Sequence, residues 1–169
     1  MMYFAYGSNM CIGRMKNRIP GAASCCTAVL AGYTIKFHTL SPKDGSGKCN
    51  AFETRSALDV VYGVIYKIAP EDKPLLDRYE GLGVVYALRN VVLECEGACI
   101  EAFTYAALPE AIDDMVLPFA WYKYYVLTGA KQNNFPASYI ERIESVYAVE
   151  DPDMERDRVN REIAGMVFA

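Results

Sequence analysis

The sequence has little histidine and tryptophan, with His38 and Trp121 as the only residues of their kind among 169. A single histidine excludes a metal site built from several imidazoles. The six cysteines are Cys11, Cys25, Cys26, Cys49, Cys95 and Cys99. None of them forms a Cys-x-x-Cys pair, which argues against a zinc site. We therefore expect no metal, and reduced thiols packed as small apolar residues in a cytoplasmic protein.

Long apolar runs and an excess charge of one sign are also missing. No apolar stretch is long enough to span a bilayer, and no basic region precedes a hydrophobic segment near the N-terminus. We expect neither a membrane partner nor a signal peptide. The net charge is −4 and the basic residues are scattered, which argues against a nucleic-acid partner. The length fits one domain, 1–169, as a monomer or homodimer.

Strand patterns dominate the first two thirds of the chain, and helical patterns dominate the end. The predicted strands are 3–6, 28–37 (single, or a bent pair broken at Gly32-Tyr33), 50–54, 60–68, 84–94 and 99–106. The predicted helices are 10–18, 70–81, 121–127, 135–146 and 154–167. Hairpin and helical connections are mixed, which is typical of an α+β fold with a mixed or antiparallel sheet, open or closed into a barrel.

Two of these predicted elements contain or adjoin residues that indicate how they are packed or where they end. The strand 60–68 is apolar on both faces and therefore central, and Gly63 within it indicates a bulge, a sharp bend or the close approach of a ligand. For the helix 121–127, Asp113-Asp114 offer an N-terminal cap and Gly129 a C-terminal stop.

The first chemical candidate is the turn Gly7-Ser8-Asn9, which joins the opening strand to the first helix. Glycine permits a close approach to the backbone, and Ser and Asn are good helix N-caps with hydrogen-bonding side chains. The free N–H groups of a helix start favour an anion such as a carboxylate. The same residues also suit an ordinary capped turn with no ligand.

The second candidate is Glu80, at the end of the predicted helix 70–81 and next to Gly81. A glutamate held in a partly apolar site suits proton transfer, although a glutamate at a helix end is also commonly solvated. Tyr86 and Tyr122 are polar aromatic candidates whose hydroxyls suit donation to a carbonyl oxygen. With thirteen tyrosines in the chain, a role in the aromatic core is the plainer alternative.

Together these pieces resemble the γ-glutamylcyclotransferase family, including its γ-glutamylamine and plant defence-associated (AIG2-like) relatives. The resemblance runs over residues 2–148. It is carried by Tyr3-Phe4-Ala5-Tyr6-Gly7-Ser8-Asn9-Met10, Val60-Val61-Tyr62-Gly63-Val64-Ile65-Tyr66, Leu76-Asp77-Arg78-Tyr79-Glu80-Gly81 and Thr128-Gly129-Ala130-Lys131-Gln132-Asn133-Asn134-Phe135-Pro136. The resemblance implies a small barrel flanked by helices.

It also implies a site. Gly7, Ser8 and Asn9 would hold the substrate, Glu80 would be the acid/base, and three pocket residues would surround them, namely Tyr6, Tyr86 and Tyr122. The implied reaction needs no cofactor, because the α-amine of the γ-glutamyl group attacks its own γ-carbonyl to give 5-oxoproline and a free amino acid or amine. Two alternatives stay open: the same chemistry on a specialised γ-glutamylated metabolite or γ-glutamylamine, and a non-catalytic module that binds γ-glutamyl or carboxylate groups.

Overall fold

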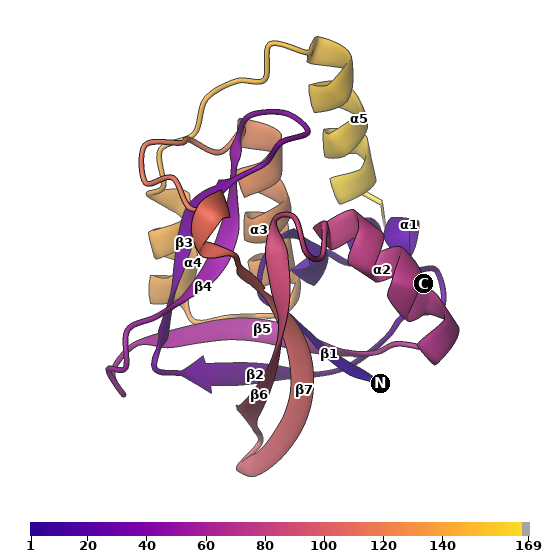
Figure 1. The fold of residues 1–169 in the computed structure, drawn as a ribbon, viewed down its shortest axis with the longest axis vertical. Helices are drawn as coiled ribbons and strands as arrows, with labels where there is room; N and C mark the ends of the chain where they lie inside the picture. Colours follow the sequence, from indigo (N-terminus) through magenta and orange to yellow (C-terminus); the bar gives the residue numbers. More distant parts are fainter. Residues whose placement is uncertain (167–169) are drawn as a thin grey trace.

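The computed structural model describes residues 1–166, and its centre is a closed β-barrel (Figure 1). The strands follow one another around the barrel as β1 (Met2–Ala5), β5 (Val60–Lys67), β2 (Ala23–Ala31), β6 (Tyr86–Cys95) and β7 (Ala98–Ala107). All neighbours are antiparallel except β1 and β7, which close the barrel in parallel. The predicted α+β fold with a small mixed barrel is confirmed.

A second, two-stranded sheet stands beside the barrel. Its strands are β3 (Tyr33–Leu40) and β4 (Gly47–Glu53). The predicted strand 28–37 is therefore a pair, because the chain breaks at Gly32, which adopts a φ of 83°, and its two halves enter different sheets. In Figure 1 the β3–β4 hairpin rises from the barrel beside α3 and α4, and its loop points towards α5.

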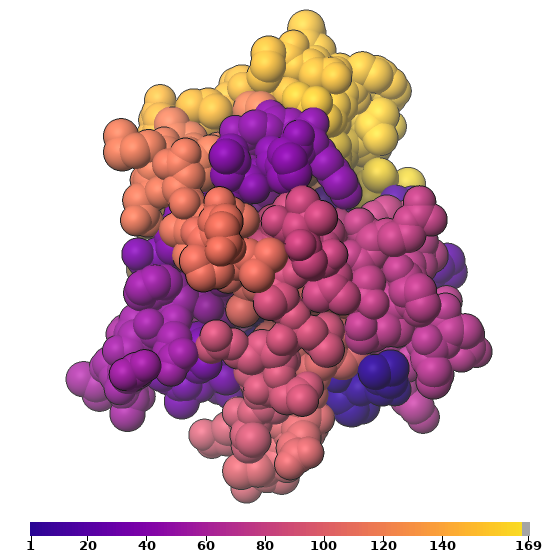
Figure 2. Space-filling model, in the orientation of Figure 1, coloured from indigo at the N-terminus to yellow at the C-terminus, as the bar shows by residue number. Residues whose placement is uncertain are grey.

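Helices cover the barrel and carry the turn that follows β1. They are η1 (Ser8–Met10), α1 (Ile12–Arg18), η2 (Pro70–Asp72), α2 (Lys73–Glu80), η3 (Pro109–Ala111), α3 (Ala120–Gln132), α4 (Ala137–Glu144) and α5 (Met154–Ala164). The predicted last helix begins where expected, while its predicted end at Val167 lies outside the described residues. Figure 2 shows that the β3–β4 loop, the chain around residues 80–90 and α5 lie on the same face.

The strand β5 is central, as predicted, with Val61, Val64 and Ile65 fully buried. Gly63 is needed for contact between strands: a Cβ atom there would lie 2.4 Å from Cε2 of Phe4. The close approach at Gly63 is made by β1 of the same barrel, where the sequence had suggested a bulge, a sharp bend or a ligand.

The prediction for the ends of the helix around Trp121 was wrong. Asp113 accepts a hydrogen bond from the backbone N–H of Met115 (2.9 Å) within a loop, and α3 begins later, after Phe119, without a side-chain cap. Gly129 does not end the helix but lies inside it, where a Cβ atom would come within 2.6 Å of the backbone N of Cys11. Glycine is required there because α3 presses against the turn after β1.

No helix in the described part of the chain combines the length and apolar character needed to cross a membrane.

Candidate active site

A narrow chamber of about 30 Å³ lies between the turn after β1 and the end of α2. Its lining is Tyr3, Tyr6, Gly7, Ser8, Asn9, Cys49, Glu80, Tyr86, Tyr105 and Tyr122. The seven residues singled out from the sequence all belong to it, although they come from the turn after β1, from α2, from β6 and from α3. A larger cavity of about 240 Å³ adjoins the chamber and shares four of its lining residues, namely Ser8, Glu80, Tyr86 and Tyr122.

The turn after β1 is shaped by close packing. A Cβ atom on Gly7 would lie 3.1 Å from Cβ of Cys49 and 3.4 Å from the hydroxyl of Tyr122, so a larger residue would push β4 and α3 away from the turn. Ser8 and Asn9 are buried within the single turn η1 and make no capping hydrogen bond. The expectation that they cap the first helix was therefore wrong, and α1 has Cys11 at its N-cap. Both residues instead line the chamber.

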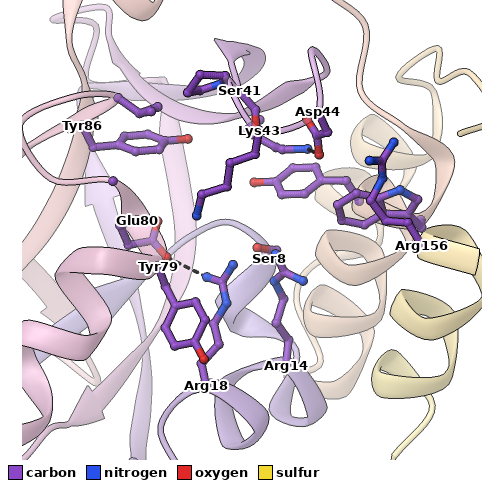
Figure 3. Close-up of a pocket in the computed structure, with 16 residues that line it drawn as sticks. Ser8, Arg14, Arg18, Ser41, Lys43, Asp44, Tyr79, Glu80, Tyr86 and Arg156 are labelled. Atoms are coloured by element: carbon purple, nitrogen blue, oxygen red, sulfur yellow. Dashed lines mark hydrogen bonds and ion pairs between the residues drawn. The ribbon is translucent and has the colours of Figure 1, made fainter. Parts of the chain in front are cut away.

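Glu80 is the last residue of α2, and Gly81 ends that helix in the left-handed conformation with φ of 68°, as predicted. The Glu80 side chain is 17% exposed. Its Oε1 accepts hydrogen bonds from Nδ2 of Asn9 (2.9 Å) and Nη1 of Arg18 (2.8 Å), the second drawn as a dashed line in Figure 3. Two charge-strengthened contacts therefore hold one oxygen of the carboxylate and fix its orientation.

The contacts continue beyond the carboxylate. Asn9 also donates from Nδ2 to the hydroxyl of Tyr3 (3.0 Å), and its Oδ1 accepts from Nη1 of Arg18 (2.9 Å). Each hydrogen bond that residues 1–166 donate to Glu80 reaches Oε1, which leaves Oε2 without a protein donor in that part of the chain. The second oxygen can therefore accept a hydrogen bond from a bound molecule.

The tyrosine hydroxyls in the chamber differ in what they can do. The hydroxyls of Tyr6 and Tyr86 donate to backbone carbonyls of Tyr105 and Cys49, so their hydrogens are already used. The hydroxyl of Tyr122 instead accepts from the backbone N–H of Cys49 (3.0 Å), and no acceptor among residues 1–166 takes its own hydrogen. Burial raises the pKa of Tyr122 well above its ordinary value. It is therefore a neutral hydrogen-bond donor at physiological pH.

Sequence reasoning did not find Arg18, Tyr3 or Tyr105. Arg18 lies in the last turn of α1, where a basic residue has an ordinary explanation in the helix dipole. Only the fold brings it to Glu80, 62 residues later. Tyr3 stands in the opening strand, within the motif, and its hydroxyl meets Asn9 inside the chamber.

The described residues contain no group of three or more His, Cys, Asp or Glu side chains placed to hold a metal. His38, the one histidine, faces Oδ1 of Asp114 (2.8 Å) and Nδ2 of Asn50 (3.1 Å). The six cysteines, all within residues 1–166, are free.

Comparison with known proteins agrees with this geometry. The model of the AIG2-like family matches residues 60–143. Gamma-glutamylcyclotransferase from Mus musculus is 27% identical and the one from Homo sapiens 28% identical, each over 170 residues that cover 98% of this chain and 87% of the relative. Over nearly its whole length the chain is similar to γ-glutamylcyclotransferases. The resemblance found in the sequence motifs is thereby confirmed.

Solved structures share the fold of this chain. A structure described as gamma-glutamyl cyclotransferase superposes with a TM-score of 0.83 at 26% identity, covering 96% of this chain and 98% of the other. YkqA from Bacillus subtilis superposes with a TM-score of 0.72 at 23% identity, covering 88% of this chain and 55% of the other, and shows the fold alone.

Proposed function

We propose that this protein cyclises a γ-glutamyl compound to 5-oxoproline and releases the amine to which the γ-carbonyl was bound. The observation that carries the proposal is the placement of the Glu80 carboxylate, anchored at one oxygen by Asn9 and Arg18 and open at the other, in a chamber walled by the turn after β1. The similarity to γ-glutamylcyclotransferases over nearly the whole chain supports the same reaction type.

The α-ammonium of the substrate would lie against Oε2 of Glu80, which takes one of its protons. The neutral amine then attacks the γ-carbonyl carbon and a C–N bond forms, closing a five-membered ring. As the resulting oxyanion collapses, the bond to the leaving nitrogen breaks and protonated Glu80 returns its proton to that nitrogen. The ring nitrogen then gives its second proton to the freed Glu80 carboxylate, which passes it to the released amine, so that the products are a neutral lactam and an ammonium. A chamber that holds the γ-glutamyl chain bent lowers the entropic part of the barrier.

The remaining chamber residues would orient the two ends of the γ-glutamyl group. The hydroxyl of Ser8 and the backbone around it would hold the α-carboxylate, with Gly7 keeping the turn narrow. The free hydrogen of the Tyr122 hydroxyl would be donated to the γ-carbonyl oxygen and to the oxyanion that develops there. Tyr6 and Tyr86, whose hydrogens are used by the protein, would shape the wall.

The test is to incubate the purified protein with γ-glutamyl-alanine, γ-glutamyl-lysine and γ-glutamyl-aspartate and to quantify 5-oxoproline. The wild type should form it from at least one compound, and Glu80→Gln should fold normally yet form almost none. Glu71→Gln, an exposed glutamate in η2 outside the chamber, is the matched control and should behave as the wild type. Saturable binding without any product would favour a binding module instead.

A cytoplasmic location stays a prediction, and the six unpaired cysteines are consistent with it.

A further inference from the structure

The cavity of about 240 Å³ outside the chamber is strongly basic, although the protein as a whole carries a net charge of −4. Its lining includes five cationic side chains, which are Arg14, Arg18, Lys43, Lys48 and Arg156. It includes only two carboxylates, Asp44 and Glu80. A concave site with this excess of positive charge concentrates the field on whatever enters it.

Three of the five cations have a carboxylate partner within the protein. The pairs are Arg18 with Glu80 (2.8 Å), Lys48 with Asp44 (2.8 Å) and Arg156 with Asp151 (2.5 Å). Each pair neutralises itself, so these side chains build the wall and contribute little net charge to the cavity. The excess positive charge of the cavity therefore comes from Arg14 and Lys43.

Arg14 and Lys43 form no ion pair with any carboxylate of residues 1–166. The guanidinium of Arg14 lies over the ring of Tyr125, 4.3 Å from its centroid, and donates from Nη1 to Asn160 (3.2 Å). Its Nε is buried without a hydrogen-bond partner in that part of the chain. Burial, helped by the nearby charge of Arg18, lowers the pKa of Arg14 to about 10, so it remains a cation at neutral pH.

Lys43 reaches the cavity from the other side. It belongs to the loop between β3 and β4 and is exposed. Figure 3 shows its side chain extending from that loop into the cavity on the side of Glu80, while Arg14 approaches from α1 below Ser8. The two unpaired cations thus reach the cavity from different parts of the fold, Lys43 from the β3–β4 loop and Arg14 from α1.

The two cavities divide the substrate between them. Under the proposed function, the γ-glutamyl group would enter the chamber from the shared mouth, with its α-carboxylate at the turn after β1. Ser8, Glu80, Tyr86 and Tyr122 line both spaces, so the bond to be broken lies at their junction and the leaving group projects into the outer cavity. The cations there are available to the leaving group.

We propose that the outer cavity is a subsite for a leaving amine that carries two negative charges, so that the preferred substrates are γ-glutamyl derivatives of amino dicarboxylic acids such as aspartate or glutamate. This inference rests on the proposed function of the adjoining chamber. Two unpaired cations are matched by two carboxylates. A γ-glutamylamine with a second ammonium group is disfavoured there because like charges repel at short range.

The experiment compares γ-glutamyl-aspartate, γ-glutamyl-alanine and γ-glutamyl-methylamide, whose leaving groups carry two, one and no carboxylates. Lys43→Gln removes one free cation from an exposed loop, Lys43→Arg keeps the charge, and Lys67→Gln is a matched control at the exposed end of β5. We expect Lys43→Gln to raise the KM of γ-glutamyl-aspartate about tenfold, that of the alanine compound less and that of the methylamide least. Arginine should restore the preference, and the control should leave it intact.

Calorimetric titration of the same compounds separates the subsite from the reaction. If γ-glutamyl-aspartate binds more tightly than the methylamide but no 5-oxoproline forms from any compound, the proposed function fails and the subsite stands. If the three compounds bind equally, or if Lys43→Gln weakens all of them alike, the subsite is overturned even when 5-oxoproline is formed. Added salt should weaken the aspartyl compound most, because its attraction is electrostatic.

Discussion

Replacing Gly129 by alanine should destabilise this protein, although the same change in an exposed helix interior stabilises by about 1 kcal/mol. The added Cβ would lie 2.6 Å from the backbone N of Cys11 and equally close to two atoms of Met10. Ordinary contacts begin near 3.4 Å, so α3 and the turn after β1 must separate by most of an ångström. Two of the three obstructing atoms are backbone and cannot rotate away.

Overpacking costs about 1–3 kcal/mol. Because backbone atoms obstruct the new Cβ, we expect the upper end of this range, about 3 kcal/mol, and a net loss of about 2 kcal/mol after the helix gain of about 1 kcal/mol. For a domain of this size that corresponds to a fall in Tm of roughly 4–8 °C. Because the displaced turn carries Ser8 and Asn9, the KM for a γ-glutamyl substrate should rise as well.

The assay is urea unfolding, together with the KM for 5-oxoproline formation. Gly165→Ala is the control, because Gly165 has a φ of −82° and the nearest atom to its Cβ would lie 3.6 Å away. A Gly129→Ala protein as stable as the wild type or more so, with an unchanged KM, would refute the claim that α3 sets the position of the turn.

Three further predictions concern the barrel, a buried ion pair and the chamber. Gly63→Ala should cost about 2–3 kcal/mol in urea unfolding, because its Cβ meets the ring of Phe4, and Phe4→Leu should recover part of that loss in the double variant. Hydrogen bonds from Arg156 lower the pKa of Asp151 to about 2. The ionised carboxylate therefore adds about 2 kcal/mol to the free energy of unfolding above about pH 4, and this contribution is lost as the pH falls through about 2. In Asp151→Asn the free energy of unfolding should depend less on pH between about 4 and 2, as measured by urea unfolding. Tyr122→Phe should lower kcat about tenfold to a hundredfold while KM changes little, and an unchanged kcat would remove its hydroxyl from the reaction.

The sequence predicted the elements well where local chemistry decides them. The β-branched strand around Val64, the hairpin at Glu96-Gly97 and the end of α2 at Gly81 follow from side-chain preference, and each is found where expected. The α3 region failed because Asp113 and Gly129 have two uses. An aspartate before a helix can cap it or close a loop turn, and a glycine can end a helix or admit a neighbouring backbone. Only the tertiary contacts decide between those uses.

The candidate site was predictable in part. The turn Gly7-Ser8-Asn9 and Glu80 were joined by family resemblance, since nothing in their spacing brings residues 71 positions apart together. Arg18 was missed because its partner lies on another helix, and no local pattern marks a long-range ion pair. The free cations of the outer cavity were equally hidden, because Lys43 and Arg14 appear in the sequence as scattered basic residues.

The central claim is that Glu80 moves the proton in a cyclisation. The most direct measurement separates binding from chemistry in Glu80→Gln: the Kd of a γ-glutamyl substrate by calorimetry, beside the rate of 5-oxoproline formation under saturating substrate. Glutamine keeps the size of the side chain and an oxygen for Asn9 and Arg18, so Kd should change by less than about tenfold while the rate falls by at least about 10². A variant that binds and cyclises like the wild type would contradict the account.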